Sequence, residues 1–577
     1  MSEPSKTEMT HIERVEEAES QEVRPKVALS TILAVFFLGL SFVPAIASGF
    51  VMPSQIIAQI GMSLDGLEDI AWIPGGWSIG AAVSFSIAGA LSDIFGRRWV
   101  VMFGQILVLV GAIVSATAST VRIVAAGSSM IGFGAGCILV SYAGIAELLP
   151  NKYRGIGLAW TEFCITIPWG VLSGYIATQL YLKSTWRWCY YISIIYAGLV
   201  LIGTYFSYYP PSHPQGDYER SRWQEFKELD FVGLGLFTAG LVVFLVGIAY
   251  LGRTTYSVPM VAATITVGGT VFISAFVYDF TIPKKPIFPL HLFRMFGEFS
   301  VYLIILFVCG MIWQSMIALS SQGALYMFTN NITEIGIISI PGNVSGVIGG
   351  WILPSLIHKI KHVRYQVFAA ILVQTIFTAS YAAVVPNNKI GYMILPMFGQ
   401  SAFTWMTILS LVASGLFVPP EELGTTAGLL GTFRSAGGSV GNAVFSTILA
   451  SNLNKHLAKN IAGAAIGSGF NPADLGKLIP AVIQNAVGVP GVLKSVPGIT
   501  TAVEEATSAA FKNTYADAFQ LVYYCTIPFG VVALVAAYFV RDPGHLMNNH
   551  VAVHQEKMVL EHRKQKEIGE DGIKVSA

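Results

Sequence analysis

A short charged segment separates two long apolar runs near the start of the chain. It contains Asp93, Arg97 and Arg98, and it is framed by Gly89 and Gly96. A charge cluster between two such runs is costly unless it lies at a membrane surface and its charges are paired. We therefore expect this segment to lie at a membrane surface and its arginines to have an acidic partner.

Glu147 is the acid that could supply that partner. It ends a later apolar run, shortly before the polar stretch 150–154. Its carboxylate could pair with Arg97 or Arg98, or it could be an interfacial residue solvated by water. We favour the pair, because an ion pair at a mobile interface is the kind of two-state element that a conformational switch needs.

A second acid, Glu162, lies deeper in an apolar run. It is about two turns in from Gly155, at roughly 3.6 residues per turn. An ionised carboxylate at such a depth is costly and tends to take up a proton. Glu162 is therefore our candidate proton carrier. The alternative is an ion pair with Arg154 or Lys152, whose long side chains could reach it.

Few other polar groups lie within the apolar runs. Arg434 could bind an anionic ligand or pair with an acid on a facing helix, and we favour the structural pair. Intramembrane glutamines form helix–helix hydrogen bonds or contact substrate. Tryptophans could stack on a flat ligand, although most are interfacial or packing residues. The candidates for lining a cavity are Gln314, Gln322, Trp160 and Trp313.

The composition places these groups in a membrane protein. The chain has 577 residues, of which 54% are hydrophobic and 12% charged, whereas soluble domains carry about 25% charged residues. The net charge of +1 gives no reason to expect a nucleic-acid partner. The scattered cysteines suit neither disulfides nor a metal site, and neither a P-loop nor a catalytic constellation occurs. We expect no metal, cofactor or enzymatic activity.

The apolar runs predict an all-α membrane protein with about fourteen transmembrane helices, since a span needs roughly 20 apolar residues. With the N-terminus in the cytosol, the cation-rich connections all fall on the cytosolic side. The predicted spans are 28–50, 70–92, 98–118, 123–148, 155–179, 188–208, 230–251, 258–280, 299–321, 334–357, 365–385, 390–415, 425–450 and 517–540.

The spans divide the chain into segments, which suggest two six-helix halves with two helices between them. A second cation-rich loop at 358–364 stands where a repeat of the first charged segment would fall, and duplicated halves are a recurring transporter design. In the connection 451–516 we expect short interfacial helices and no folded domain. The segments are a disordered cytosolic tail at 1–27, an N-terminal six-helix bundle at 28–208, a cytosolic loop at 209–229, two linker helices with a cytosolic loop at 230–298, a C-terminal six-helix bundle at 299–540 with the long outside loop 451–516, and a cytosolic tail at 541–577.

One connection predicted to lie outside carries a glycosylation sequon. It is Asn331-Ile332-Thr333, which makes Asn331 a candidate acceptor if the chain is a glycoprotein.

The charged segment resembles the signature loop of the major facilitator superfamily. Gly89, Leu91, Asp93, Gly96, Arg97 and Arg98 match its pattern, while Ile94 occupies a position that is usually Arg. Further stretches resemble the fourteen-span drug:proton antiporters, and among them most of all the fungal trichothecene-efflux-pump-like proteins and siderophore–iron transporters. These stretches are Trp186-Arg187-Trp188, Leu229-Asp230-Phe231-Val232-Gly233, Pro289-Leu290-His291-Leu292-Phe293-Arg294 and Phe433-Arg434-Ser435-Ala436-Gly437-Gly438.

The resemblance implies a major facilitator fold and secondary active transport by alternating access. The expected activity is proton-coupled efflux of a small hydrophobic or amphipathic compound, such as a toxin, drug or secondary metabolite. The alternative is proton-coupled import of ferric siderophores. The charged segment and Glu147 would then form the cytosolic gate. We expect a monomer in the lipid bilayer, in the plasma membrane or else in the vacuolar or another internal membrane.

Three positions depart from the antiporter pattern. The first span, around Leu40-Ser41-Phe42, lacks the usual acid; Ser128 stands where the group has Arg; and Pro168 lacks the preceding Gly. Proton coupling through those groups is therefore not expected here, and Glu162 remains the candidate.

Overall fold

The structure is a computed structural model that describes residues 29–66, 69–70, 72–149, 153–210, 230–250, 257–282, 288–329, 331–419, 422–486, 492–493 and 496–546. Within these ranges the regular structure is helical throughout. The N-terminal half comprises α2 (Leu29–Leu40), η1 (Val43–Val51), α3 (Met52–Gln55), α4 (Ile57–Ser63), α5 (Trp72–Phe95), α6 (Arg97–Ala116), α7 (Val121–Leu139), α8 (Ser141–Leu148), α9 (Arg154–Ile165), η3 (Thr166–Gly170), α10 (Ser173–Lys183) and α11 (Trp188–Ser207).

Two linker helices, α13 (Phe231–Tyr250) and α14 (Val258–Thr281), lead to the C-terminal half. That half comprises α15 (Leu290–Arg294), η4 (Phe296–Ser300), α16 (Val301–Met327), α17 (Ile332–Asn343), η5 (Gly346–Ile352), α18 (Leu353–Ser355), α19 (Ile357–Ile360), α20 (Val363–Val384), α21 (Lys389–Phe417), α22 (Leu423–Gly467), η7 (Pro472–Asp474), α23 (Leu475–Ala486), α24 (Thr501–Tyr538) and η9 (Gly544–Leu546).

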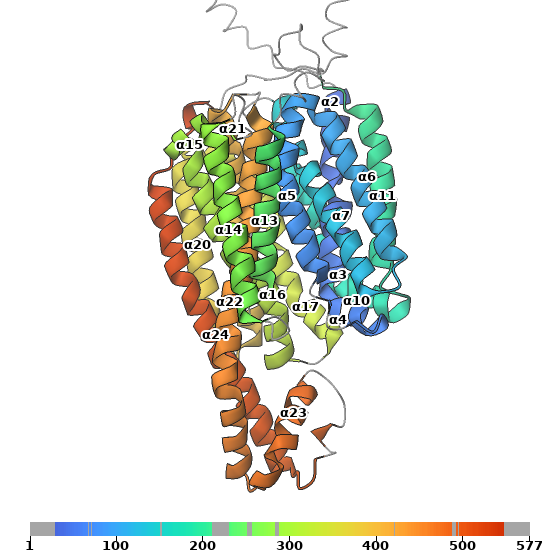
Figure 1. Ribbon diagram of the computed structural model, residues 1–577, viewed down its shortest axis with the longest axis vertical. Helices are drawn as coiled ribbons and strands as arrows, with labels where there is room; N and C mark the ends of the chain where they lie inside the picture. The colour runs from blue at the N-terminus through green and yellow to red at the C-terminus, as the bar shows by residue number, and fades with distance from the viewer. Residues whose placement is uncertain are drawn as a thin grey trace, which may run out of the picture.

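The helices form one elongated bundle (Figure 1). Twelve helical stretches in the described ranges are long and apolar enough to cross a membrane. The remaining predicted spans are α5, which is rich in Gly, Ala and Ser, and α22, which is rich in Gly, Ser and Thr. These small residues lower the mean hydropathy of both helices and allow them to pack closely against each other. The prediction of an all-α membrane fold is confirmed.

The two halves lie side by side, and the linker helix α13 contacts both of them through α5 and α22. Figure 1 shows the first and last described residues at the same end of the bundle, as expected if both chain ends face one compartment. We call this the terminal end. The opposite end carries the projecting parts of α22, α23 and α24, and we call it the appendage end.

The connection 451–516 differs from the prediction of short interfacial helices without a folded domain. Helix α22 continues without a break to Gly467, and α24 already begins at Thr501. Each of the three helices here presents an apolar stripe too short to span a membrane, and the stripes meet in a core of their own. That core includes Ile461, Ala465, Phe470, Leu478, Val482, Leu493, Val503 and Phe511.

The predicted N-terminal tail 1–27 lies outside the described residues. So do most of the predicted C-terminal tail 541–577 and all but the first two residues of the loop 209–229. The predicted tail 541–577 begins differently from expectation, because its first residues are docked. Arg541 Nη1 lies 2.5 Å from Glu298 Oε1, and Asp542 Oδ1 accepts a hydrogen bond from the backbone N–H of Val363 at 3.1 Å. Asp542 thus caps the exposed N-terminus of α20.

Candidate functional site

The predicted charged loop is reduced to one residue between two helices. Helix α5 extends to Phe95, and α6 begins at Arg97. Gly96, which links them, has a φ of +86°, a conformation that other residues rarely adopt. Asp93 lies within α5, and its side chain is outside the described part of the structure.

Arg97 and Glu147 form a buried ion pair. Arg97 Nη2 lies 2.6 Å from Glu147 Oε1, and the two side chains are only 1% and 3% exposed. Glu147 is therefore not an interfacial residue solvated by water. Both residues belong to the N-terminal half, on α6 and α8, so the pair does not itself join the two halves.

Arg98 takes a different partner from Arg97. Its Nη2 donates to the carbonyl oxygen of Tyr205 at 2.8 Å, and its guanidinium lies 3.9 Å from the ring centroid of Tyr209. Arg98 therefore holds the start of α6 against the end of α11 rather than pairing with Glu147.

Glu162 lies on α9 with a neutral partner. The Tyr142 hydroxyl on α8 donates to Glu162 Oε1 at 2.9 Å. On the other side Glu162 packs against η5 of the C-terminal half, where a Cβ at Gly350 would lie 2.7 Å from the Cβ of Glu162. The alternative pairing with Arg154 is not observed: Arg154 Nη1 donates to the carbonyl of Gly415 at 3.2 Å. Lys152 is outside the described residues.

Arg434 brings a positive charge to this region from the C-terminal half. It lies on α22 and is close enough for its charge to act on both Glu162 and Tyr142. No ion pair or hydrogen bond joins Arg434 to Glu162. Glu162 and Tyr142 thus share a hydrogen bond within the N-terminal half, while Arg434 of the C-terminal half acts on them through its charge and not through a hydrogen bond.

The four cavity candidates divide by their contacts. Gln314 Nε2 donates to Ser78 Oγ at 3.4 Å and so bridges the two halves. Trp313 stacks on Phe403 within the C-terminal half, with centroids 4.7 Å apart. Trp160 packs between α2 and α9, stacked on Phe36. Gln322 is exposed on α16.

The two halves touch at both ends of the bundle. At the terminal end, a Cβ at Gly89 would lie 2.5 Å from the carbonyl oxygen of Gly424. At the appendage end, a Cβ at Gly174 would lie 3.0 Å from Ser339 Oγ and 3.1 Å from the Cα of Gly336. In both places close approach of two backbones requires glycine. The two halves are therefore in close contact at both ends of the bundle.

Two clefts lie between these contacts, each lined from both halves. The terminal-end cleft encloses about 370 Å³, including space open to solvent, and its lining includes Tyr142, Arg154, Gly415, Thr426 and Leu430. The appendage-end cleft encloses about 460 Å³ on the same measure, and its lining includes Gln55, Ser320, Asn343, Tyr392 and Gln400. Glu162 belongs to neither lining.

Comparison with known proteins identifies the family. A model of the fungal trichothecene efflux pump (TRI12) family matches residues 23–572. The chain belongs to this family. It is 28% identical over 512 residues to the trichothecene efflux pump TRI12 of Fusarium sporotrichioides, which covers 88% of this chain and 84% of that protein.

Other relatives of this efflux-pump family member are transporters. The MFS-type transporter prx5 of Penicillium rubens is 30% identical over 78% of this chain and 81% of its own length. Siderophore iron transporter 1 of Schizosaccharomyces pombe is 27% identical over 66% of this chain and 64% of its own length. The chain is thus a multi-pass membrane transporter of the major facilitator superfamily and not an enzyme.

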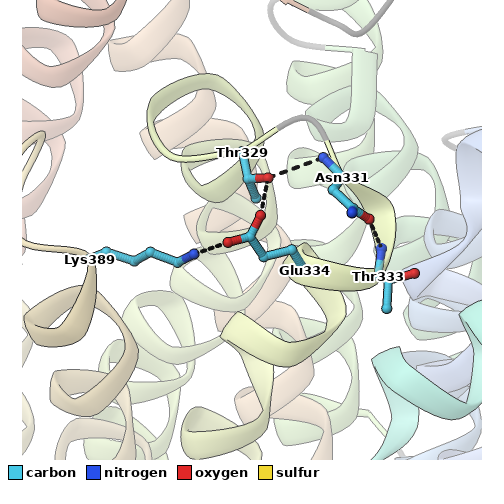
Figure 2. Close-up of polar contacts among 5 residues, drawn as sticks. All are labelled: Thr329, Asn331, Thr333, Glu334 and Lys389. Carbon is cyan, nitrogen blue, oxygen red and sulfur yellow. Dashed lines mark hydrogen bonds and ion pairs between the residues drawn. The ribbon is translucent and has the colours of Figure 1, made fainter.

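The sequon of this family member lies at the start of α17 (Figure 2). Asn331 is exposed and caps α17, because its Oδ1 accepts from the backbone N–H of Thr333 at 3.0 Å. Next to it, Glu334 accepts hydrogen bonds from Lys389 and from Thr329. Capping leaves the Asn331 amide nitrogen available, and its glycosylation stays a prediction.

Two contacts that this efflux-pump family member makes at the site are not predicted from the sequence. Tyr142 contacts Glu162 across two antiparallel helical stretches, and a tyrosine within an apolar run gives no sign of such a contact. Arg154 was considered only as a partner for Glu162. Instead it is the buried cation that crosses to the C-terminal half.

Proposed function

We propose that the protein exports small hydrophobic or amphipathic compounds in exchange for protons, by alternating access, and that Glu162 carries the proton. The observation that carries the proposal is the set formed by Glu162, Tyr142 and Arg434 between the two halves. Export is supported by the family, whose description names an efflux pump. We place the protein in the plasma membrane as a monomer.

The charge on Arg434 gives Glu162 a way to link protonation to conformation. When Glu162 is ionised, Arg434 attracts it across the boundary between the halves; when Glu162 is protonated, that attraction is lost. At an effective dielectric constant of about 20, two unit charges that are not in contact can still attract by about 2 kcal/mol. Such an energy changes the ratio of two conformations by roughly thirty-fold.

Substrate would occupy the space between the halves, which the two clefts approach from opposite ends. Several polar contacts across that boundary are hydrogen bonds between neutral side chains, such as Gln314 with Ser78 and the Ser86 and Thr432 hydroxyls 2.7 Å apart. Such contacts can break at low cost when the halves rock. This suits repeated opening at alternating ends.

The predicted gate consists of the charged segment and Glu147, but the contacts between the halves involve other residues. The Arg97–Glu147 pair fixes α6 against α8 within one half, whereas Gly89 with Gly424 and Arg154 with Gly415 are contacts between the halves at the terminal end. We propose that the ion pair keeps the end of the N-terminal half rigid and that these two contacts open and close.

The test is transport in proteoliposomes with an imposed pH gradient. We expect Glu162→Gln to abolish gradient-driven accumulation of substrate while retaining substrate exchange at equal pH. Glu334→Gln is the matched control, since Glu334 is paired with Lys389 at the appendage end. Full gradient-driven accumulation by Glu162→Gln would refute the assignment of the proton to this residue.

The alternative, import of ferric siderophores, is favoured by the relative in Schizosaccharomyces pombe. Expression in a yeast lacking its own exporters and siderophore carriers separates the two. Our proposal predicts lower retention of toxic compounds and no gain in ferric siderophore uptake. The opposite pattern would favour import.

A further inference from the structure

We propose that the Tyr142 hydroxyl transfers protons between Glu162 and water in the terminal-end cleft. This rests on the proposed function, in which Glu162 carries the proton. The family comparisons say nothing of this residue, and its place in the structure carries the argument.

Tyr142 stands between the cleft and the acid. It is part of the cleft lining, whereas Glu162 is not. Its hydroxyl donates to Glu162 Oε1 at 2.9 Å, a normal hydrogen-bond length. The Tyr142 hydroxyl is therefore the first group that a proton leaving Glu162 toward the terminal-end cleft would reach.

The tyrosine ring is held in place for this role. Tyr142 is 4% exposed, and its ring packs edge-on against Phe42 with centroids 5.0 Å apart. The charged groups near it are Glu162 from α9, Arg434 from α22 and Arg154 in the same cleft lining, while η5 presents the uncharged Gly350 to Glu162. A fixed donor beside a single carboxylate suits directional transfer better than a mobile side chain.

The cleft itself has polar groups that water can satisfy. Arg154 Nε and the Thr426 hydroxyl are buried and have no hydrogen-bond partner among the described residues. Both residues line the cleft, one from each half. Buried water typically binds where several otherwise unsatisfied polar groups converge. We therefore place water in the cleft, next to Arg154, Thr426 and Tyr142.

The transfer balances as a relay through one oxygen. For release, protonated Glu162 gives its proton to the Tyr142 oxygen while the original phenol proton moves to cleft water. Glu162 becomes a carboxylate, the phenol is regenerated, and the water leaves as hydronium. Uptake from this side is the reverse. No tyrosinate accumulates and no other reactant is needed.

Tyr142→Phe is the decisive variant because it removes only the hydroxyl and keeps the ring. In proteoliposomes with a pH gradient we expect the initial rate of driven transport to fall by at least about tenfold, a modest effect for a proton-transfer group. The final accumulation ratio should match wild type, since the relay changes the rate of proton transfer and not the stoichiometry. Exchange at equal pH should be unchanged.

The controls separate the Tyr142 relay from the proposed function, in which Glu162 carries the proton. Tyr190→Phe removes another buried hydroxyl of the N-terminal half, outside the cleft lining, and should transport normally. If gradient-driven transport by Tyr142→Phe runs at the wild-type rate while Glu162→Gln loses accumulation, the relay is refuted and the proposed function stands. If Glu162→Gln accumulates normally, the proposed function fails and the relay fails with it.

A second variant covers the case in which Tyr142→Phe loses exchange as well and is therefore misfolded. Thr426→Val removes a hydroxyl that would hold cleft water and keeps the side-chain shape. We expect it to slow gradient-driven transport by about two- to fivefold with exchange intact, a smaller effect than loss of the transfer group itself. An unchanged driven rate in Thr426→Val would then overturn the relay.

Discussion

Two buried acids of the N-terminal half, Glu147 and Glu162, are held in opposite ways. Glu147 is 2.6 Å from Arg97, a cation of the same half, and both side chains are almost fully enclosed. Glu162 has the neutral Tyr142 as its hydrogen-bond partner, and the cation that acts on it, Arg434, belongs to the other half. An acid paired within one rigid unit keeps its charge throughout a cycle, whereas an acid whose cation can move away need not.

The comparison predicts that the Glu147 pair matters most for stability. Glu147→Gln should leave Arg97 charged, buried and without its partner, which costs about 3–5 kcal/mol in other proteins. We expect a large drop in the thermal unfolding temperature in detergent. Glu162→Gln should lower that temperature little, because a neutral amide can still accept from Tyr142. An equal drop in unfolding temperature in both variants would contradict the distinction between the ion-paired Glu147 and Glu162 with its neutral partner.

Replacing both members of the Arg97–Glu147 pair sharpens the same point. The double variant Arg97→Met with Glu147→Leu should recover most of the stability that Glu147→Gln loses, since well-packed apolar residues often replace a buried ion pair at little cost. Thermal unfolding of the single and double variants measures this directly. A double variant as unstable as Glu147→Gln would mean that the residues act separately.

Arg434 provides the next contrast, because it should affect coupling more than folding. Arg434→Gln removes the charge that acts on Glu162, so we expect weaker gradient-driven accumulation, by up to about thirty-fold, the ratio that corresponds to an attraction of about 2 kcal/mol. Arg434→Lys keeps the charge and should retain part of the coupling. The ratio of driven accumulation to equal-pH exchange is the measurement. If Lys and Gln variants behave alike, the charge is not what Arg434 contributes.

A smaller effect is expected at the terminal end. Gly89→Ala would place a Cβ 2.5 Å from the Gly424 carbonyl oxygen, so the two backbones must separate. We expect a shift toward conformations open at that end. Labelling of a single cysteine introduced at Leu430 in the terminal-end cleft should become severalfold faster. Gly174→Ala, at the other end, is the control and should not accelerate it.

Arg98 should give the smallest effect. It lies over the Tyr209 ring and donates to a backbone carbonyl at the edge of the N-terminal half. Contacts of this kind contribute about 0.5–1 kcal/mol at accessible sites, so Arg98→Gln should lower the unfolding temperature slightly and leave transport near wild type. A loss as large as that of Glu147→Gln would show that Arg98 shares the gate role.

The sequence predicts the helices well because hydrophobic length decides where a chain crosses a bilayer. It also singles out Arg97, Arg98, Glu147 and Glu162, since charges inside apolar runs are few. It does not decide between Arg97 and Arg98, because neighbouring helical residues point about 100° apart and the facing helix determines which one reaches Glu147. That choice is a matter of packing.

The contacts between distant segments are what the sequence could not supply. Tyr142 meets Glu162 only because α8 and α9 fold back on each other, and Arg154 reaches Gly415 only because the halves meet at that end. For 451–516 the sequence predicts short interfacial helices, and it misses the long continuous helices and their common core for another reason. Their apolar stripes are short and alternate with Gly and Ala, and they are stabilised by continuing directly from α22 and α24.

The most direct test of the account is substrate flux against external pH in Glu162→Gln and in Glu147→Gln, each reconstituted and corrected for the amount of folded protein. We expect Glu162→Gln to lose the pH dependence of flux and the gradient-driven accumulation. Glu147→Gln should give less folded protein, and that folded protein should keep the wild-type pH profile. A normal pH profile in Glu162→Gln together with its loss in Glu147→Gln would contradict the account and move the proton to the ion pair.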